Sequence, residues 1–440
     1  MTQPKTTTQA ITVALLGGGT VGSQVARILT EDADMLAAKA GAPLRLAGVA
    51  VRSTDRRRDY QLPKDMYTTE AEPLIDGADI VVELMGGIEP ARTLIEQALR
   101  DGKAVVTGNK ALLARHGEEL SAIAAEHGAQ LAFEAAVAGA IPILRPLRDS
   151  LSGDRVTRIM GIANGTTNFI LDRMDSVGAD FADALAEAQE LGYAEADPTA
   201  DVEGHDAAAK VAILATLAFG TDYSIDEVSC EGITQITAAD SAAAADAGYV
   251  IKLLGIAERR TGQDGAEGAV LRVHPTMVPR EHPLAAVRGA YNAVYVEAEN
   301  AGELMFYGPG AGGAPTASAV MGDVVSVAER LVRGGPARVR TSIASLPALD
   351  AEEAHTSVMV VLTVADAPGV LRRVAGVFEG HGVSIEAMRQ NSATAEGESE
   401  VQLRIITHHA RQRDLDATVE ELRDLDVVRG VVSVVRVEGK

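Results

Sequence analysis

Short runs of apolar and β-branched residues alternate with longer stretches rich in Ala and Leu through the first 135 residues of the chain. The β-like runs occupy residues 11–16, 44–51, 79–84, 104–106 and 131–133. Strands that alternate with segments of helical length form βαβ units, which pair in parallel and are covered by helices on both faces. This alternation predicts that residues 1–145 form a doubly wound α/β domain with one parallel sheet.

The pattern changes near residue 146. Longer β-like runs, interleaved with helices, follow at residues 156–163, 249–257, 270–274 and 293–298. They predict a mixed α/β domain over residues 146–314. A helical stretch at 315–335 is expected to pack back on the first domain, and a Gly-, Pro- and Ser-rich segment at 336–354 is expected to be a linker. Residues 355–440 follow the order βαββαβ, which indicates a ferredoxin-like module that is complete in itself.

The composition is that of an ordinary globular protein, with 47% hydrophobic and 23% charged residues among 440. The chain has 40 basic and 62 acidic residues, and the net charge of −22 argues against a nucleic-acid partner. We expect no membrane span, because the sequence has no run of about 18 apolar residues. The polar start lacks the apolar core of a signal peptide, and the single Cys230 excludes a disulfide framework, so a reducing, cytoplasmic location is expected.

The first β-like run ends in a glycine-rich loop with the pattern G-x-G-x-x-G. Gly17, Gly19 and Gly22 are the three glycines, and Thr20 and Val21 stand between the last two. In this position glycines allow a tight turn and close approach of a pyrophosphate, which the amide groups of the following helix can bind. The motif predicts a Rossmann-type dinucleotide site; the alternative is a tight turn without a ligand.

The end of the second β-like run indicates which dinucleotide is bound. An acidic residue there would accept the ribose hydroxyls of NAD, whereas an arginine suits the additional 2′-phosphate of NADP. The sequence has Arg52 at this point, followed by three arginines at 56–58. We therefore expect Arg52 to bind the cofactor and NADP to be preferred, with NAD as the alternative. The later arginines are more typical of a solvated loop.

Two lysines are candidates for catalysis. Lys110 follows the run at 104–106, where open α/β sheets place their ligands, and could be either a surface charge or a catalytic cation. Lys210 lies in an apolar helical stretch at 206–219, whose other charged residue is Asp206. The two could form an i,i+4 ion pair, but burial of so apolar a helix would make unpaired ions costly and would favour a ligand.

The densest polar cluster of the chain leads into this helix. Its carboxylates Glu195, Asp201 and Asp206 could together bind an ammonium group, and Lys210 could then meet a carbonyl oxygen or a hydroxyl. His205 lies among them and suggests a metal site. The spacing of zinc motifs is absent, however, so a turn or cap residue is the simpler interpretation.

Two further glycine clusters, at residues 161–167 and 308–313, are expected to form tight loops that bring the backbone close to a ligand, or ordinary turns. Together with the motifs above, they make the chain resemble the homoserine dehydrogenases over essentially its whole length. The residues that carry the resemblance are 17–22 (GGGTVG), 79–87 (DIVVELMGG), 107–110 (TGNK), 164–168 (NGTTN), 192–210 (GYAEADPTADVEGHDAAAK) and 307–313 (YGPGAGG). Gly108 departs from the family pattern, in which Ala is commoner, but the lysine beside it is retained.

The resemblance implies reversible, NAD(P)H-dependent reduction of L-aspartate 4-semialdehyde to L-homoserine, in the biosynthesis of threonine, methionine and isoleucine. By position, Lys210 resembles the family's proton donor and Lys110 its second catalytic lysine. Glu195 and Asp206 match the family's substrate-binding acids. A hydride arriving at an aldehyde builds negative charge on oxygen, which a nearby ammonium group stabilises.

Other site residues are implied by the resemblance alone. Gly192 and Gly310 match glycines near the substrate and the cofactor. The family also binds a sodium-like ion, and backbone carbonyls would suit such a hard cation. The positions that match its ligands are Glu134, Val137, Gly139 and Ile141.

The C-terminal module resembles an ACT domain, a type of module that binds amino acids in regulated biosynthetic enzymes. The resemblance rests on the segment DAPGVL at its first strand–helix junction, where the candidate regulatory residues are Asp366, Pro368, Gly369 and Val370. It implies L-threonine as the effector and, because such modules pair with one another, a homodimer or homotetramer. Two alternatives remain open: another amino-acid dehydrogenase or imine reductase on the same scaffold, and an amino-acid-sensing regulatory protein without catalysis.

Overall fold

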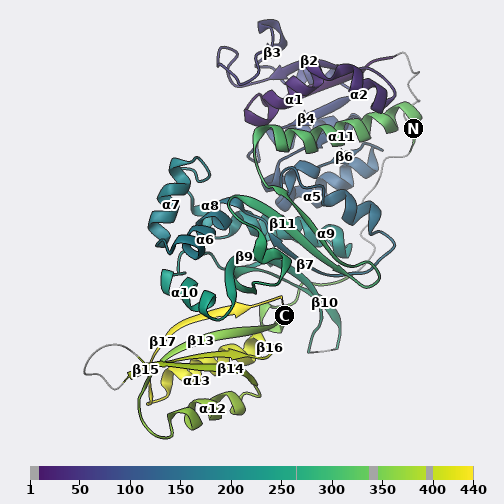
Figure 1. Ribbon diagram of the computed structural model, residues 1–440. Coiled ribbons are helices and arrows are strands. Elements are labelled where there is room, and N and C mark those ends of the chain that lie inside the picture. The colour runs from purple at the N-terminus through teal and green to yellow at the C-terminus, as the bar shows by residue number, and fades with distance from the viewer. Residues whose placement is uncertain (1–8, 264, 336–344, 393–399, 440) are drawn as a thin grey trace. The chain divides into compact units, whose positions relative to one another are not determined.

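The computed structural model describes residues 9–263, 265–335, 345–392 and 400–439 (Figure 1). The chain divides into two compact units, each built from several segments. The first unit comprises residues 1–159, 209–227 and 291–345, and the second comprises residues 160–208, 228–290 and 346–440. The domain and linker boundaries expected from the sequence, at residues 145, 314, 336 and 354, remain predictions.

The first unit is built around a six-stranded sheet in the order β3-β2-β1-β4-β5-β6. Its strands are β1 (Ile11–Leu16), β2 (Leu44–Ala50), β3 (Tyr67–Thr68), β4 (Ile80–Glu83), β5 (Ala104–Thr107) and β6 (Leu131–Ala132). All neighbouring strands in it are parallel. The order confirms the predicted Rossmann-type sheet, which winds outward on both sides of the β1–β4 pair. The two-residue strand β3 is too short for a periodic pattern to predict it.

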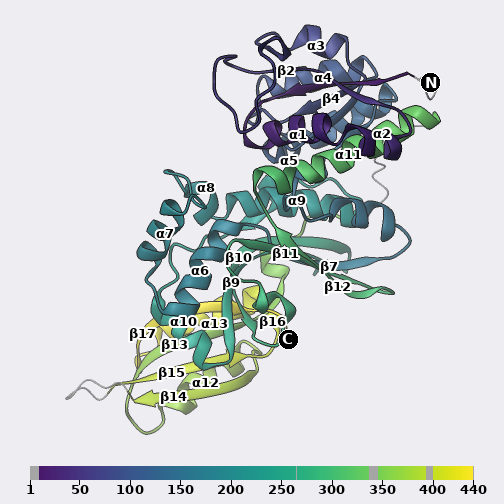
Figure 2. The same cartoon turned by 45° about the horizontal axis from the view of Figure 1, so that its top comes forward.

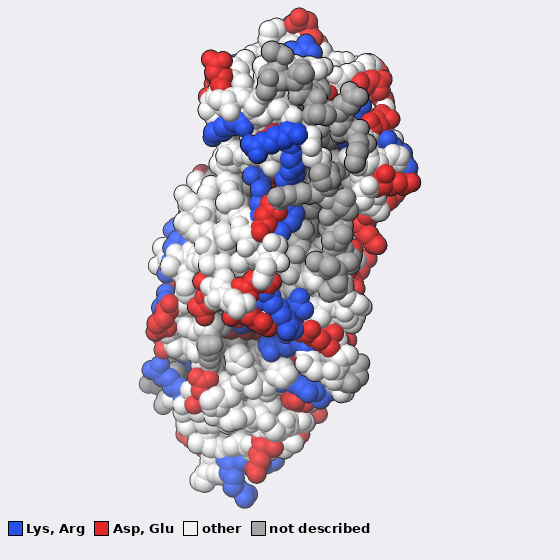
Figure 3. Space-filling view, turned by 90° about the vertical axis from the view of Figure 1, so that its right-hand side faces the viewer, with Lys and Arg blue, Asp and Glu red and all other residues white. Residues whose placement is uncertain are grey.

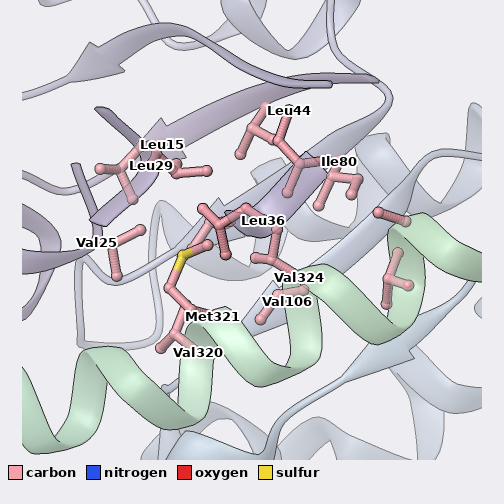
Figure 4. Close-up of a cluster of buried hydrophobic side chains, with 14 of the residues drawn as sticks. Leu15, Val25, Leu29, Leu36, Leu44, Ile80, Val106, Val320, Met321 and Val324 are labelled. Atoms are coloured by element: carbon pink, nitrogen blue, oxygen red, sulfur yellow. The ribbon is translucent and has the colours of Figure 1, made fainter. Parts of the chain in front are cut away.

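Helices cover both faces of this sheet (Figure 2). One face carries α1 (Thr20–Glu31), α2 (Ala33–Ala40) and α11 (Gly313–Arg333), and the other carries α3 (Glu72–Asp76), α4 (Ala91–Arg100) and α5 (Lys110–Glu126). Helix α11 comes from far along the chain, and its apolar stripe, which includes Val320 and Val324, is buried against α1, β4 and β5 (Figure 4). Burial of each such side chain contributes about 2 kcal/mol.

The first unit also contains a β-hairpin formed by β11 (Tyr291–Ala298) and β12 (Gly302–Pro309), which pair in antiparallel fashion. Strand β12 includes Gly308, so the glycine cluster at 308–313 is partly strand and not simply a loop. Strand β7 (Val156–Ile162) and helix α9 (His205–Phe219) contribute residues to both units.

The central part of the second unit is a long antiparallel pair, β9 (Tyr249–Thr261) and β10 (Glu267–Pro279). The short strand β8 (Ser229–Cys230) pairs with β10. The helices of this part are α6 (Gly165–Val177), α7 (Phe181–Glu190), α8 (Thr199–Val202) and α10 (Ala238–Asp246). Helix α6 packs on β9 and on α7.

The C-terminal module of the second unit has the predicted βαββαβ order. Its elements are β13 (His355–Ala365), α12 (Val370–Gly380), β14 (Ile385–Ser392), β15 (Glu400–Thr407), α13 (Gln412–Asp424) and β17 (Val428–Val437), with a short strand β16 (Ala410–Arg411) before α13. The strands form an antiparallel sheet in the order β17-β13-β15-β14, and α12 and α13 bury one apolar core against it. This is the expected ferredoxin-like arrangement.

The module is not complete in itself, contrary to the expectation from the sequence. Its strand β17 also pairs in parallel with β10, through Thr276 with Arg436 and Met277 with Val437. A strand pattern identifies a strand but does not specify what pairs with its second edge. The sheet of the module is therefore continuous with the β9–β10 pair.

A buried ionic network lies at this junction. Arg272 of β10 bonds to Glu258 of β9 and, at 2.7 Å, to Glu438, which follows β17. Arg260 bonds to the other oxygen of Glu258 at 2.8 Å. Arg272, Glu258 and Glu438 are at most 3% exposed, so removal of one partner would leave a charge without compensation in the interior.

The surface in Figure 3 carries basic and acidic side chains in small groups that lie next to one another. The net charge of −22 is thus compatible with local basic groups on this face. Across the described residues, no helix combines the length and the apolarity that a membrane span requires.

Candidate functional site

The glycine loop joins β1 to α1 in the first unit. Gly17 has a left-handed backbone (φ 106°), and a Cβ there would lie 2.6 Å from the carbonyl oxygen of Leu84. A Cβ on Gly22 would lie 2.1 Å from the carbonyl oxygen of Gly17, so the helix start packs directly on the loop. A Cβ on Gly19 would meet nothing within 4 Å, and Gly19 caps α1 without a side chain. The free space beside these helix-start amides fits a pyrophosphate.

Two arginines follow β2, the strand next to β1. Arg52 is exposed two residues after the end of the strand. Arg58 is held in place, because its Nη2 donates to the carbonyl of Ser53 at 2.6 Å and its guanidinium lies 4.3 Å from the ring centre of Tyr67. The buried Nε of Arg58 has no hydrogen-bond partner among the described residues, and a Cβ on Gly18 would lie 2.9 Å from it. Arg58 thus differs from the solvated residue that the sequence pattern favours, and it lies against the glycine loop.

Lys110 is the first residue of α5, at the carboxyl end of β5. The preceding Asn109 caps the helix by accepting from the amide of Leu112 at 3.2 Å, and its Nδ2 donates to the carbonyl of Gly87 at 2.6 Å. Thr107, at the end of β5, donates to the carboxylate of Glu83 at 2.6 Å. These buried bonds fix the segment around Lys110 at the edge of the sheet where a doubly wound fold binds ligands.

Lys210 and Asp206 lie one turn apart on α9, and therefore on one face of it. Each is only 7% exposed, which confirms that the apolar helix is buried. Lys210 belongs to the first unit, together with Lys110, and Asp206 belongs to the second. Charged groups buried to this extent need partners of opposite charge or a ligand.

In the second unit, Asn164 joins two of the candidate acids. Its Nδ2 donates to Asp201 at 2.7 Å and to Asp206 at 2.8 Å. Its Oδ1 accepts from the amide of Thr167 at 2.9 Å, so the same side chain caps α6. The cluster at 161–167 is thus the end of β7, a two-residue loop at 163–164 and the start of α6, so the tight loop is shorter than the cluster. An Asn three residues before Thr at a helix start is an N-cap signal that could have identified it.

The other acid and the glycine of this cluster lie on the loop between α7 and α8. Glu195 is exposed, and its backbone carbonyl accepts from Gln189 at 3.1 Å. Gly192 has a left-handed backbone (φ 76°) in the turn that ends α7. His205 is the exposed first residue of α9. Among the described residues, no group of three His, Cys, Asp or Glu side chains could hold a metal ion.

Two buried carboxylates of the first unit share one arginine. Glu134 is 3% exposed and accepts from the amides of Leu144 (2.8 Å) and Arg145 (2.9 Å). The Arg145 guanidinium pairs with Glu134 at 3.4 Å and with Asp323 at 3.0 Å. Burial, together with the charge of Asp323, raises the pKa of Glu134.

The turn after Glu134 contains the remaining residues suggested for a cation. Val137 and Ile141 have buried side chains, so their carbonyl oxygens are the groups that could bind an ion. Gly139 is left-handed (φ 57°), and a Cβ there would lie 2.4 Å from the carbonyl oxygen of Gly310. A Cβ on Gly310 would in turn lie 2.1 Å from the side chain of Asn292. The glycine cluster therefore permits close backbone packing against this turn.

The predicted regulatory residues lie at the junction of β13 and α12. Asp366 and Pro368 are exposed in the loop, Gly369 is left-handed (φ 89°) at the helix cap, and Val370 begins α12 with its side chain in the core of the module.

Comparison with known proteins identifies the family. The family models that match describe homoserine dehydrogenase (residues 142–325), the NAD-binding domain of homoserine dehydrogenase (residues 17–134) and the ACT domain (residues 358–427). The chain is 52% identical to homoserine dehydrogenase of Corynebacterium glutamicum over 98% of this chain and 96% of that protein. The chain belongs to the homoserine dehydrogenase family.

Other relatives and solved structures that the chain matches are also homoserine dehydrogenases. Homoserine dehydrogenase of Mycobacterium tuberculosis is 53% identical over 97% of both chains. The crystal structure of a homoserine dehydrogenase from Thiobacillus denitrificans covers 98% of this chain and 99% of its own with a TM-score of 0.89 and 40% identity. A hyperthermophilic archaeal homoserine dehydrogenase in complex with NADPH covers 75% of this chain and 100% of its own, with a TM-score of 0.60 and 27% identity. The chain is an oxidoreductase of amino-acid biosynthesis that acts on a CH–OH group and has a nicotinamide cofactor site.

Proposed function

We propose that this chain reduces L-aspartate 4-semialdehyde reversibly to L-homoserine, with Lys210 and Asp206 of α9 at the centre of the site. The observation that carries this proposal is that both charged residues are buried on one face of an apolar helix, with Asp206 joined to Asp201 through Asn164. The carboxylate pair can bind the ammonium group of the substrate, and the lysine can bind its aldehyde oxygen.

The two lysines have separate roles in this proposal. When bound, the reduced nicotinamide supplies a hydride to the aldehyde carbon. Lys210 stabilises the negative charge that builds on the aldehyde oxygen and donates the proton that completes the hydroxyl group; in the reverse direction its neutral amine takes that proton back. Lys110, fixed at the end of β5, is the second catalytic lysine and acts as a further cation.

The acids bind the substrate's ammonium group. Asp201 and Asp206 are held together by Asn164 and offer the remaining lone pairs of their carboxylates. Glu195 supplies a third carboxylate from the exposed loop, and the backbone of Gly192 lies on the same loop.

The cofactor is NADP in preference to NAD. The residues assigned to it are Gly17, Gly19, Thr20, Val21, Gly22, Arg52, Lys110, Gly192 and Gly310. Arg52 follows β2, and the buried Nε of Arg58 beside the glycine loop adds a second positive charge, which suits a 2′-phosphate. Arg52→Asp should lower the ratio of kcat/KM with NADPH to kcat/KM with NADH, and an unchanged ratio would remove Arg52 from the assignment.

A sodium-like cation binds near Glu134, with the carbonyl oxygens of Val137, Gly139 and Ile141 as the other ligands. The pair of buried acids with one arginine supports a monovalent charge at this place. The oxygen-rich donor set suits a hard cation.

L-Threonine is the proposed effector of the C-terminal ACT domain, with Asp366, Pro368, Gly369 and Val370 at its site. Because such modules form ligand sites when they pair, the protein is a homodimer or homotetramer. We place it in the cytoplasm, where a protein with one cysteine needs no disulfide. An Asp366→Ala variant that retains full sensitivity to threonine would argue against this site.

Loss of NADPH absorbance on addition of aspartate semialdehyde tests the reaction itself. Lys210→Ala should lower kcat by about 10²–10⁴-fold, the usual contribution of a general acid, while NADPH affinity is retained. Lys64→Ala, at a lysine whose side chain is 88% exposed, is the matched control and should retain wild-type kcat. Near-normal turnover of Lys210→Ala would refute its role, and no activity in the wild type would refute the reaction.

A further inference from the structure

Lys252 is a fully buried lysine that the proposed chemistry does not use. It is 0% exposed in β9, where its neighbours from 250 to 257 are apolar and buried. Its Nζ donates to Oδ1 of Asn168 at 2.9 Å and to the carbonyl oxygen of Val287 at 2.6 Å. Both hydrogen-bond acceptors are neutral oxygens, which compensate a buried ammonium group less well than a directly bonded carboxylate does, and the charges of Asp172 and Asp175 add to this compensation. Burial lowers the pKa of Lys252 to about 8. An apolar residue would fill this position at lower cost, which indicates a role other than packing.

The side chain that Lys252 fixes belongs to the first turn of α6. Asn168 is 1% exposed, and its Nδ2 donates to the carbonyls of Val287 (3.3 Å) and Gly289 (2.8 Å) while its Oδ1 accepts from Lys252. Asn168 thus ties the start of α6 both to β9 and to the segment that follows β10. Loss of the lysine would take its donor away from the buried Oδ1 of Asn168.

A second set of contacts holds the other end of α6. Asp175 pairs with Arg280 at 2.6 Å and with Arg288 at 2.8 Å, and Asp172 pairs with Arg288 at 2.8 Å. Burial alone would raise the pKa of Asp175, but hydrogen bonds from the two arginines outweigh it and lower the pKa. The arginine side chains are 39% and 46% exposed. The carboxyl end of α6 therefore has ion-pair anchors of its own, whose charges also act on Lys252.

The start of α6 carries the amide that organises the candidate acids. Asn164 caps the helix four residues before Asn168, about 6 Å away along the axis. Both N–H groups of its side chain are used, one on Asp201 and one on Asp206. A shift of the first turn of α6 would therefore move the donor that holds the two carboxylates together.

We propose that Lys252 is a positioning residue for substrate binding: through Asn168 it fixes the first turn of α6, and thereby the Asn164 amide that sets the spacing of Asp201 and Asp206. Lys252 does not touch the substrate. The proposal rests on the proposed function, in which these two acids bind the substrate's ammonium group.

A double-mutant cycle in the full-length enzyme tests the connection. Lys252→Met keeps the volume and removes the donor, and should raise the KM for aspartate semialdehyde at least tenfold while the KM for NADPH changes less than twofold. In an Asn164→Ala background, the same substitution should raise the KM less than twofold further, because the amide through which it acts is gone. Lys252→Arg, which retains N–H donors, should recover most of the wild-type KM.

Two further variants make the outcome decisive. Arg280→Met removes an anchor at the carboxyl end of the same helix and, as the matched control, should leave the KM for semialdehyde within twofold. If Lys252→Met does not fold, Asn168→Leu replaces it: this variant removes the acceptor through which Lys252 acts, together with the donors to Val287 and Gly289, and the KM should rise severalfold. An equal effect of Lys252→Met in both backgrounds, or an equal effect of Arg280→Met, would overturn the proposal.

The failure of the proposed function gives a different result. If Asp201 and Asp206 do not bind the substrate, Asn164→Ala alone will leave the KM for semialdehyde unchanged. If Asn164→Ala raises that KM and Lys252→Met does not, the assignment of the acids stands and only the role of Lys252 is overturned.

Discussion

Arg272→Met should destabilise the second unit strongly. The guanidinium of Arg272 is 3% exposed and bonds to Glu258 of β9 and to Glu438 after β17. Methionine fills a similar volume but has no charge, so two buried carboxylates lose a shared cation. Removal of one partner from a buried ionic group typically costs about 3–5 kcal/mol of unfolding free energy. The Arg260 bond to Glu258 offsets part of this loss, so we expect a decrease of about 3 kcal/mol.

Urea unfolding followed by circular dichroism at pH 7.5 measures this decrease. The matched control is Arg436→Met, one strand away, because Arg436 pairs with Glu231, whose side chain is 53% exposed; it should cost less than about 1 kcal/mol. Adding Glu438→Gln to Arg272→Met should restore part of the stability, since a neutral amide is less costly to bury than an unpaired carboxylate. A loss below about 1 kcal/mol for Arg272→Met, or no recovery in the double variant, would refute this account of the junction.

Three other outcomes follow from the geometry. Gly22→Ala should raise the KM for NADPH by more than tenfold, because its methyl group would lie 2.1 Å from the carbonyl oxygen of Gly17; steady-state kinetics with a normal cofactor KM would contradict this. Added NaCl, compared with choline chloride, should raise the Tm of the wild type by more than that of Glu134→Gln, and equal shifts would contradict a cation at Glu134. The pKa of Lys252 is lowered from 10.5 to about 8. Between pH 8 and 10.5 the unfolded chain therefore binds one proton more than the folded chain does. Over this range the unfolding free energy of the wild type, relative to that of Lys252→Met, should rise by up to about 3 kcal/mol. A difference that stays flat with pH in denaturant unfolding would argue against the lowered pKa.

Most of the fold follows from local sequence patterns. Strand β1 begins and ends at the residues that the pattern predicts, and α9 is buried, as the predominance of apolar residues around it indicates. Strand β12 is missed, since its residues are only partly buried and so show no apolar alternation. The pairing of β17 with β10 is missed for another reason: hydrogen bonding along a strand edge is made by the backbone, which the side-chain pattern does not encode.

Less of the candidate site than of the fold can be predicted from the sequence. The glycine loop is predictable, because its close backbone contacts require glycine and the spacing of these glycines forms a motif. The roles of three other residues cannot be predicted, since each role depends on a contact with residues far along the chain. These residues are Asn164, Arg58 and Lys252. A lone asparagine, arginine or lysine has no spacing rule that distinguishes it from a surface residue until the fold brings its partners close.

The shared strand at the junction limits how the C-terminal module can be exchanged or removed. A chain shortened before residue 346 would lose β17 and expose the edge of β10, whose free N–H and C=O groups invite pairing with other chains. It would also take Glu438 away from Arg272. We therefore expect such a truncated enzyme to be more prone to aggregation than the full-length chain, whether or not the module senses an amino acid. Transplanting the module onto another enzyme would likewise require the matching edge of β10, so in this protein the module is not an interchangeable part.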